Sequence, residues 1–250
     1  MLATRIIPTI LSRNGQLVKG VGFKADRVVG NALQAARVHA MRGVDELVLL
    51  DVTATKEGRE PDYEMVRRLS EGLFTPLTVG GGIKNAHHVE KLLRAGADKV
   101  CLGSLAFEDW DEIKKLSERF GNQCVTVSID ALPSGKACIK FDDYGFLDHQ
   151  YRVTQYAKGM EEWGAGEILL QSVMHDGTME GYDIDLIKAV SKAVSIPVIA
   201  SGGCSGHEDM YNAIKAGASA VAAGALFQFT DATPRAAAEY LSGKGIEVRV

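Results

Sequence analysis

The sequence predicts an α/β protein of one domain, a (β/α)8 TIM barrel closed by eight parallel strands. Short apolar runs alternate with amphipathic helical stretches along all 250 residues, and this length matches one such barrel. Strand and helix in alternation give a parallel sheet, and eight such units in one domain favour a closed barrel over a doubly wound open sheet.

The strands are expected, in chain order, at Ile6–Leu11, Leu47–Val52, Pro76–Val79, Lys99–Leu102, Cys124–Ile129, Ile168–Gln171, Pro197–Ala200 and Ala220–Ala223. Their composition is β-branched and apolar, as in strands buried on both faces. Helical spacing predicts helices that include Glu64–Gly72, Ala86–Ala95, Asp109–Phe120, Thr154–Trp163, Ile184–Val194 and Glu208–Ala216. Glycines recur where helices should end, as left-handed C-caps require: Gly43, Gly72, Gly96, Gly121, Gly164 and Gly217.

An internal repeat relates the two halves of the chain. The segment 76–82 (PLTVGGG) matches 197–203 (PVIASGG) at an offset of 121 residues, and Gly103 falls opposite Gly224 at the same offset. The repeat predicts two half-barrels, 1–121 and 122–250, which need each other to close their sheet edges.

Composition excludes several classes of function. A net charge of −4 and a pI near 5.9 provide no basic surface for nucleic acid or an anionic membrane. The four cysteines are far apart with no CxxC pair, which predicts neither a zinc site nor a disulfide framework. Adjacent His87 and His88 diverge on a helix and predict no metal pair. We expect a cytoplasmic protein, since no signal peptide or membrane span is evident.

Glycine clusters follow four of the predicted strands, at the barrel end where phosphate commonly binds. Two phosphate sites facing each other would suit a ligand with a phosphate at each end. The alternative is that these glycines only form tight turns, and four clusters in register make this less favourable. The predicted phosphate-binding residues are Gly81, Gly82, Gly103 and Ser104 in the first half, and Gly202, Gly203, Gly224, Ala225 and the weaker candidate Gly177 in the second.

A combination of motifs makes nearly the whole chain resemble the HisF family, the cyclase subunits of imidazole glycerol phosphate synthase. The motifs are 5–7 (RII), 18–20 (VKG), 45–51 (DELVLLD), 78–83 (TVGGGI), 164–170 (GAGEILL), 176–178 (DGT), 181–183 (GYD) and 200–203 (ASGG). The resemblance implies that ammonia comes from a glutaminase, HisH-like, docked on the N-terminal face of the barrel. It also implies a bisphosphorylated ribonucleotide substrate and neither a metal nor an organic cofactor.

The resemblance implies two catalytic aspartates, and only one is present. Asp130 matches the aspartate of the fifth strand, whereas Leu11 stands where the first strand should carry the other. The repeat pairs these two positions at an offset of 119. Leucine cannot transfer a proton, and losing a positioned acid or base costs about 10²–10⁴-fold in rate. The chain also departs from the family at Gly103, Gln171, Met174 and Ala225, where Asn, Thr, Asp and Ser are usual.

Charged residues stand at or just before the starts of four predicted strands: Arg5, Glu46, Lys99 and Glu167. They should converge on the floor of the barrel as a ring of alternating sign. The family resemblance implies a gate for ammonia, and the alternative is an ion-pair plug that only stabilises the barrel.

A long segment follows the first strand, from Ser12 to Val29, and we expect it to be a mobile lid. Lys19 matches the family's loop lysine and is expected to close over a phosphate; otherwise it is a surface lysine. Asp51 and Asp176, at the ends of the second and sixth strands, are secondary polar candidates.

Three functions remain open at this point. The first is a HisF-like synthase subunit that transfers ammonia to a phosphorylated or nucleotide-linked sugar, as in surface-polysaccharide sugar synthesis, where some HisF-like relatives also have leucine at the first aspartate position. The second is the imidazole glycerol phosphate synthase subunit of histidine biosynthesis, with another residue as the acid. The third is a barrel without catalytic activity that stimulates the glutaminase and conducts ammonia.

Overall fold

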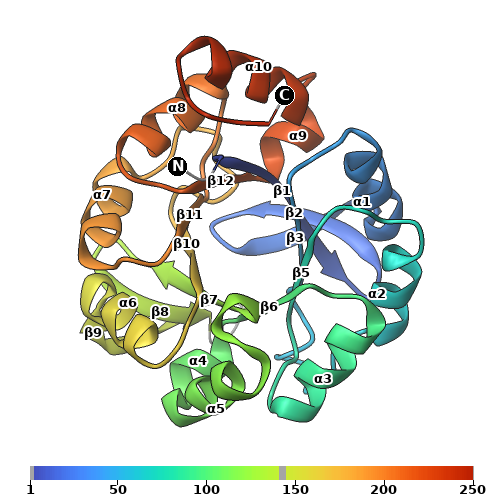
Figure 1. Ribbon diagram of the computed structural model, residues 1–250, viewed down its shortest axis with the longest axis vertical. Helices are drawn as coiled ribbons and strands as arrows, with labels where there is room; N and C mark the ends of the chain where they lie inside the picture. Colours follow the sequence, from blue (N-terminus) through green and yellow to red (C-terminus); the bar gives the residue numbers. More distant parts are fainter. Residues whose placement is uncertain (1–2, 141–144, 250) are drawn as a thin grey trace.

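The computed structural model describes residues 3–140 and 145–249, and eight parallel strands form a closed barrel in it (Figure 1). The last barrel strand pairs with the first, and the fifth pairs with the sixth, so the ring of eight strands is closed. The predicted TIM barrel is thus confirmed. In order around the barrel, the strands are β1 (Arg5–Arg13), β4 (Leu47–Asp51), β5 (Leu77–Gly80), β6 (Lys99–Leu102), β7 (Val125–Ala131), β10 (Glu167–Ser172), β11 (Val198–Ser201) and β12 (Ala220–Ala223).

Helices surround the barrel (Figure 1). The longer ones are α1 (Ala32–Met41), α2 (Tyr63–Ser70), α3 (Ala86–Ala95), α5 (Trp110–Phe120), α6 (Val153–Glu162), α7 (Ile184–Ala193), α8 (His207–Lys215) and α10 (Pro234–Gly243). Two short helices, α4 (Ser104–Glu108) and α9 (Ala225–Phe229), follow β6 and β12, and the 3-10 turn η1 (Asn122–Cys124) precedes β7. Several helices begin at an Asn, Asp or Thr whose side chain accepts a backbone N–H of the first turn, as Asn85 does for α3.

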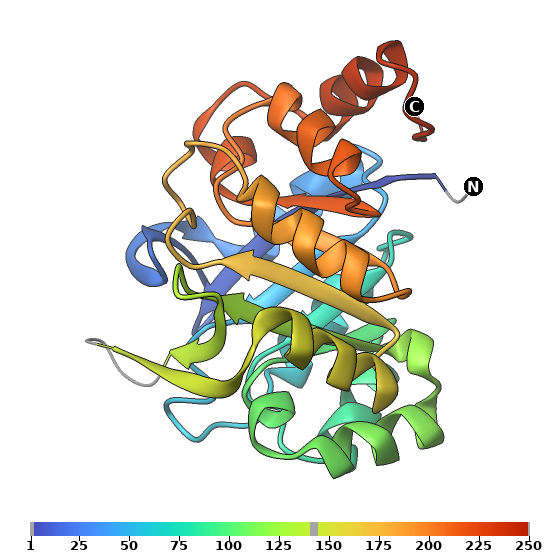
Figure 2. The ribbon, with the colours of Figure 1, turned by 90° about the vertical axis from the view of Figure 1, so that its left-hand side faces the viewer.

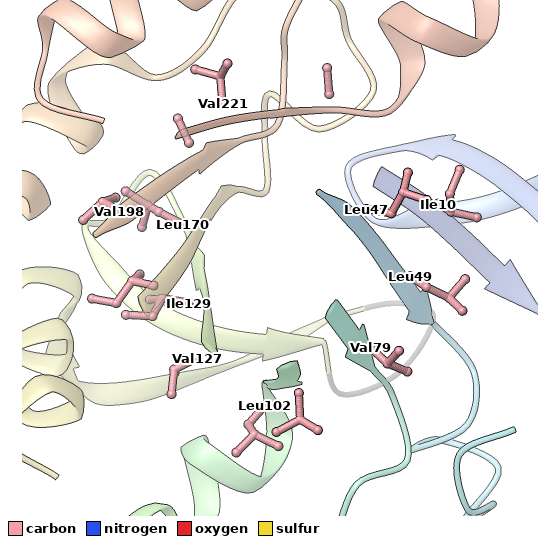
Figure 3. Packing of buried hydrophobic residues seen from close by; sticks show 14 of the residues in the cluster. Ile10, Leu47, Leu49, Val79, Leu102, Val127, Ile129, Leu170, Val198 and Val221 are labelled. Atoms are coloured by element: carbon pink, nitrogen blue, oxygen red, sulfur yellow. The ribbon is translucent and has the colours of Figure 1, made fainter. Parts of the chain in front are cut away.

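Alternation along the strands divides the buried side chains into two sets. The larger set faces the helices, and Figure 3 shows members of it such as Ile10, Leu49 and Val127. The smaller set fills the barrel interior: Ile7, Val48, Cys101, Leu169, Ile199, Ala220 and Ala222. Because successive residues of a strand point to opposite sides, Arg5, Thr9 and Leu11 lie on the same interior side of β1 as Ile7. The barrel is a packed core whose two ends carry polar side chains.

Two β-hairpins extend beyond the C-terminal ends of the barrel strands. One follows β1 and consists of β2 (Gln16–Val21) and β3 (Lys24–Asn31); the other follows β7 and consists of β8 (Lys136–Lys140) and β9 (Phe146–Arg152). Figure 2 shows both at the end of the barrel opposite to the chain termini. The Phe23 and Phe146 rings, one from each hairpin, lie 6.1 Å apart between centroids. The two hairpins therefore touch.

The segment 12–29, expected to be a mobile lid, has regular secondary structure. It completes β1 and then forms most of the hairpin β2–β3. The hairpin pairs with β1 through Ser12 and Leu17, so its base continues the barrel sheet.

Candidate functional site

A cleft of about 520 Å³ opens at the C-terminal ends of β1, β10, β11 and β12. It is lined by Leu11, Gln171 and Ser201, together with several residues that the sequence predicts as site residues. These are Lys19, Asp176, Gly177, Gly202, Gly203, Gly224 and Ala225. The structure thus brings the predicted second-half phosphate positions together in one cleft with the hairpin lysine.

Lys19 reaches this cleft from strand β2 and is buried, with an exposed fraction of 6%. Its Nζ donates to the carbonyl oxygen of Thr9 at 3.2 Å. A Cβ placed on Gly224 would overlap this Nζ, although the Gly224 backbone conformation is open to any residue. The Lys19 ammonium group therefore occupies the space that a side chain at position 224 would take, and it would have to move for any other residue to fit. Burial lowers the Lys19 pKa to about 8, against the opposing effect of the Asp176 charge, so Lys19 is a cation at neutral pH.

Backbone contacts hold the hairpin β2–β3 against the segment after β10. Gly22 N donates to Asp176 O at 2.9 Å, and Phe23 N donates to the Asp176 carboxylate at 3.4 Å. Gly177 lies so close to the hairpin that a Cβ on it would overlap Gly20 O, and its φ of +73° is itself one that favours glycine. Burial raises the Asp176 pKa, while the Phe23 N–H and Lys19 oppose this rise.

Asp130 lies near the end of β7, half-buried, and its carboxylate has polar partners from two strands. Gln171 Nε2 donates to Asp130 Oδ1 at 3.1 Å, and Ser128 Oγ donates to the same oxygen at 3.4 Å. Burial raises the Asp130 pKa to about 7, although both hydrogen bonds lower it. A carboxyl group of this kind exchanges a proton near neutral pH, as an acid or base catalyst must.

Leu11 takes the corresponding place on β1 and lies in register with Leu50 of β4. In the second half, Asp130 lies in register with Gln171 of β10. The offsets are 119 (130 − 11) and 121 (171 − 50), so the same pair of places is apolar in one half and polar in the other. Leu11 supplies no group that can exchange a proton.

The first-half positions are arranged differently. Asp51 accepts the Thr53 and Ala54 N–H groups, each at 3.0 Å, and forms an ion pair with Arg59 at 3.2 Å. Gly82 N donates to Thr55 Oγ1 at 3.2 Å. Asp51 and Gly81 line a smaller cleft of about 290 Å³. Gly82 lies in the turn after β5, while Gly103 and Ser104 form the N-cap and first residue of α4 after the adjacent strand β6. These three line neither cleft.

Arg5, Glu46, Lys99 and Glu167 meet at the N-terminal end of the barrel as a closed ring of alternating charge. Arg5 contacts Glu46 at 2.6 Å and also pairs with Glu167. Lys99 Nζ lies 3.0 Å from a carboxylate oxygen of each glutamate. Burial raises the Glu46 pKa, but Lys99 and Arg5 outweigh it, so the pKa is lowered overall. Thr78 Oγ1 also donates to Glu46, at 2.6 Å.

Comparison with known proteins identifies the family. The sequence profile of the family described as "Histidine biosynthesis protein" matches residues 5–233. The imidazole glycerol phosphate synthase subunit HisF of Endomicrobium trichonymphae is 44% identical over 250 residues, all of this chain and 96% of that protein.

The chain belongs to the HisF family.

Two further HisF relatives match over the full length of both chains. That of Dictyoglomus thermophilum is 42% identical over 251 residues. A Campylobacter jejuni protein named as a putative imidazole glycerol phosphate synthase subunit hisF2 is 41% identical over 250 residues. The HisF family is an enzyme family of synthase subunits, so this chain is an enzyme of that class. The names of these relatives favour the histidine alternative over the surface-polysaccharide role expected first.

Some residues of this HisF barrel's site were not singled out from the sequence. Ser128 and Ser201 contact the Asp130 and Gln171 side chains, and Thr78 contacts the charged ring. Alternation along the strands could have identified them, because residues an even number of positions apart on a strand face the same side. Each of the three lies at such a spacing from a predicted site residue or from an interior residue of its strand. In residues 3–140 and 145–249, no cluster of three or more His, Cys, Asp or Glu side chains is arranged to hold a metal ion. Within the same ranges, no helix is both long and apolar enough to cross a membrane.

Proposed function

We propose that this chain is the synthase subunit that adds ammonia to a bisphosphorylated ribonucleotide, in the reaction for which its HisF relatives are named. The arrangement of Lys19 with the glycines of the second half supports this proposal. One end of an anionic substrate would bind the Lys19 ammonium and the N–H groups around Gly203 and Gly224. Asp130, on the opposite side of the mouth, would exchange protons at the reacting centre. The first-half positions Gly82, Gly103 and Ser104 would receive the second phosphate.

The proposal includes a glutaminase docked on the N-terminal face. Met41 is 88% exposed and Phe74 is fully exposed. They lie at the end of α1 and just after α2, in connections that lead into neighbouring strands β4 and β5. Exposed side chains of this size suit the buried centre of a protein interface. The charged ring at the same end would then be the entrance for ammonia.

A second candidate is a HisF-type subunit that acts on a different phosphorylated or nucleotide-linked sugar. Leu11 is the observation that favours it, because the histidine-pathway reaction in this family relies on an acid or base there. The surface-polysaccharide pathway is one setting for such an acceptor, and the names of the relatives give it no support.

The test is turnover of the histidine-pathway bisphosphate by the purified chain with ammonium as the nitrogen source. Cyclisation at rates typical of the family supports the first candidate. An Asp130→Asn variant serves as the control and should lose about 10²–10⁴-fold in rate. No turnover by the wild-type chain, with binding of the bisphosphate retained, favours the second candidate. If Asp130→Asn leaves product formation by the complex with glutaminase intact, the barrel acts only as a conduit.

A further inference from the structure

The side-chain amide of Gln171 lies beside the Asp130 carboxylate, and strand register places the two residues opposite each other. Gln171 Nε2 donates to Asp130 Oδ1 and to Ser128 Oγ, at 3.1 Å in both cases. Both N–H bonds of the amide nitrogen are therefore used. On its other side, Gln171 Oε1 lies 3.5 Å from Ser201 Oγ. The amide thus bridges strands β7 and β11.

Each partner in this network can either donate or accept a hydrogen bond. A protonated Asp130 needs an acceptor, and rotation of the Gln171 amide by half a turn presents Oε1 to it. The hydroxyl groups of Ser128 and Ser201 reverse their roles in the same way. An arginine or lysine at 171 could only donate, and it would stabilise the ionised carboxylate alone.

We propose that Gln171 is a positioning residue for Asp130, holding the carboxyl group in one orientation and hydrogen-bonding to its ionised form more strongly than to the protonated acid. The inference deepens the proposed function, on which its consequence for catalysis rests. It concerns a residue at which this chain departs from the family resemblance, which has threonine there.

Among the groups around Asp130, Gln171 is one of the main influences on the Asp130 pKa. Among the residues that the structure describes, the titratable groups that interact with it are Cys101 of β6, Cys138 of β8, Tyr156 of α6 and Asp176. Burial raises the pKa of each of the two thiols and of the phenol, so all three are neutral at pH 7. Asp176 raises the Asp130 pKa further, whereas Gln171 and Ser128 lower it. Without the Gln171 amide, less would oppose the rise in the Asp130 pKa that burial causes.

The test is an NMR titration of Asp130 in protein labelled with carbon-13 at the aspartate carboxyl groups. Gln171→Met keeps the side-chain length and removes the amide, and it should raise the Asp130 pKa by about one unit or more. Gln171→Asn keeps an amide that is one methylene too short, and the pKa should rise there too. Asp130→Asn identifies the resonance. Ser172→Ala is the matched control on the same strand, since its hydroxyl contacts His175 and not Asp130, and it should leave the Asp130 pKa unchanged.

A pKa within about 0.3 of a unit of wild type in the Gln171 variants overturns the proposal; if Gln171→Met does not fold, Gln171→Asn decides. In active protein, the pH profile of kcat/KM should move upward by the same amount as the NMR pKa in Gln171→Met, and a profile that does not move also contradicts it. The titration needs no substrate. Failure to turn over the bisphosphate therefore counts against the proposed function only, and an unshifted titration in an active enzyme counts against this inference only.

Discussion

Leu11 and Asp130 lie at equivalent places on β1 and β7, which are four strands apart in the barrel of eight and so on opposite sides of its mouth. Their neighbours in register, Leu50 and Gln171, continue the contrast between an apolar wall and a polar one. We therefore expect proton exchange in the reaction to depend on Asp130 and on Lys19, which approaches from β2.

A carboxylate at position 11 tests whether the apolar side chain there limits the rate of the reaction. If Leu11 limits the histidine-pathway reaction, Leu11→Asp should raise ammonium-dependent turnover of the bisphosphate by about 10²-fold or more. Steady-state kinetics with purified protein would measure it. Leu50→Asp adds the same charge on the neighbouring strand and should give no such gain. Equal gains in both variants would mean that position 11 has no special role.

The pH dependence of the reaction should report Asp130. Because its pKa is raised to about 7, the ionised base is scarce below this pH and predominates above it. With Asp130 as the base, kcat/KM should rise as the pH passes through about 7 and level off above it. A profile that is flat between pH 6 and 8 (roughly one unit either side) would assign the base to another group.

Anion binding should weaken as Lys19 loses its proton. The Lys19 pKa is about 8 in the free protein, and a bound anion raises it by favouring the charged form. The affinity for an anion should therefore be highest below about pH 8 and fall as the pH rises through that value. Sulfate is a suitable probe for calorimetry because its charge does not change over this range. Lys19→Met should weaken sulfate binding about tenfold at neutral pH and remove the pH dependence.

Lys24→Met changes an exposed lysine of the same hairpin and is the control for the Lys19 experiment. It should leave sulfate affinity nearly unchanged. If the two variants behave alike, Lys19 acts only through the overall charge of the hairpin.

The charged ring should make a measurable contribution to stability. Lys99→Met leaves Glu46 and Glu167, whose side chains are 2% and 8% exposed, with Arg5 as the remaining ring cation. Breaking a buried pair in this way should lower the free energy of unfolding by about 3 kcal/mol. Lys91→Met removes an exposed lysine paired with Glu60 and should cost less than about 1 kcal/mol. Urea denaturation measures both.

The contribution of the ring should also disappear in acid. The Glu46 pKa is lowered from 4.5, so its stabilising contribution is present above that value and is lost as the pH falls through the lower value of the folded state. The stability difference between wild type and Lys99→Met should shrink in the same range. A difference that is constant down to strongly acidic pH would contradict an ionic origin.

Gly177→Ala tests the contact between the hairpin β2–β3 and the segment after β10. The added methyl group meets Gly20 O, and the positive φ adds strain of about 1–2 kcal/mol. Gly15→Ala is a matched control, because Gly15 has a φ of +77° and no atom within 4 Å of its Cβ position. Both variants carry the strain, so the excess destabilisation of Gly177→Ala measures the contact. Faster proteolysis of the hairpin in Gly177→Ala alone would confirm it, and equal behaviour would refute it.

The barrel strands could be predicted from sequence because their apolar β-branched runs are short and regularly bounded. The predicted Lys99–Leu102 and Ala220–Ala223 match β6 and β12 residue for residue. The hairpins could not be predicted in the same way. In β2–β3, register shifts interrupt the pairing near Val18 and Val21, so the alternation that marks a strand is broken. Helices α1 and α10 were not among those singled out.

The ring of charges could be predicted because all four residues stand at or just before the start of a strand. The position of the Lys19 ammonium group beside Gly224 could not be predicted, since it depends on the fold of the hairpin. The same holds for Gln171: its contact with Asp130 depends on the register between β7 and β10, which alternation alone does not specify. The roles of these residues in binding and catalysis stay predictions.

The two hairpins occupy corresponding places in the two halves, with starts 120 residues apart (136 − 16) and ends 121 apart (152 − 31). An ancestral gene that encoded a single half-barrel would give this spacing only if it already contained the hairpin when it was copied and fused. Under such an origin, the hairpin is older than the duplication.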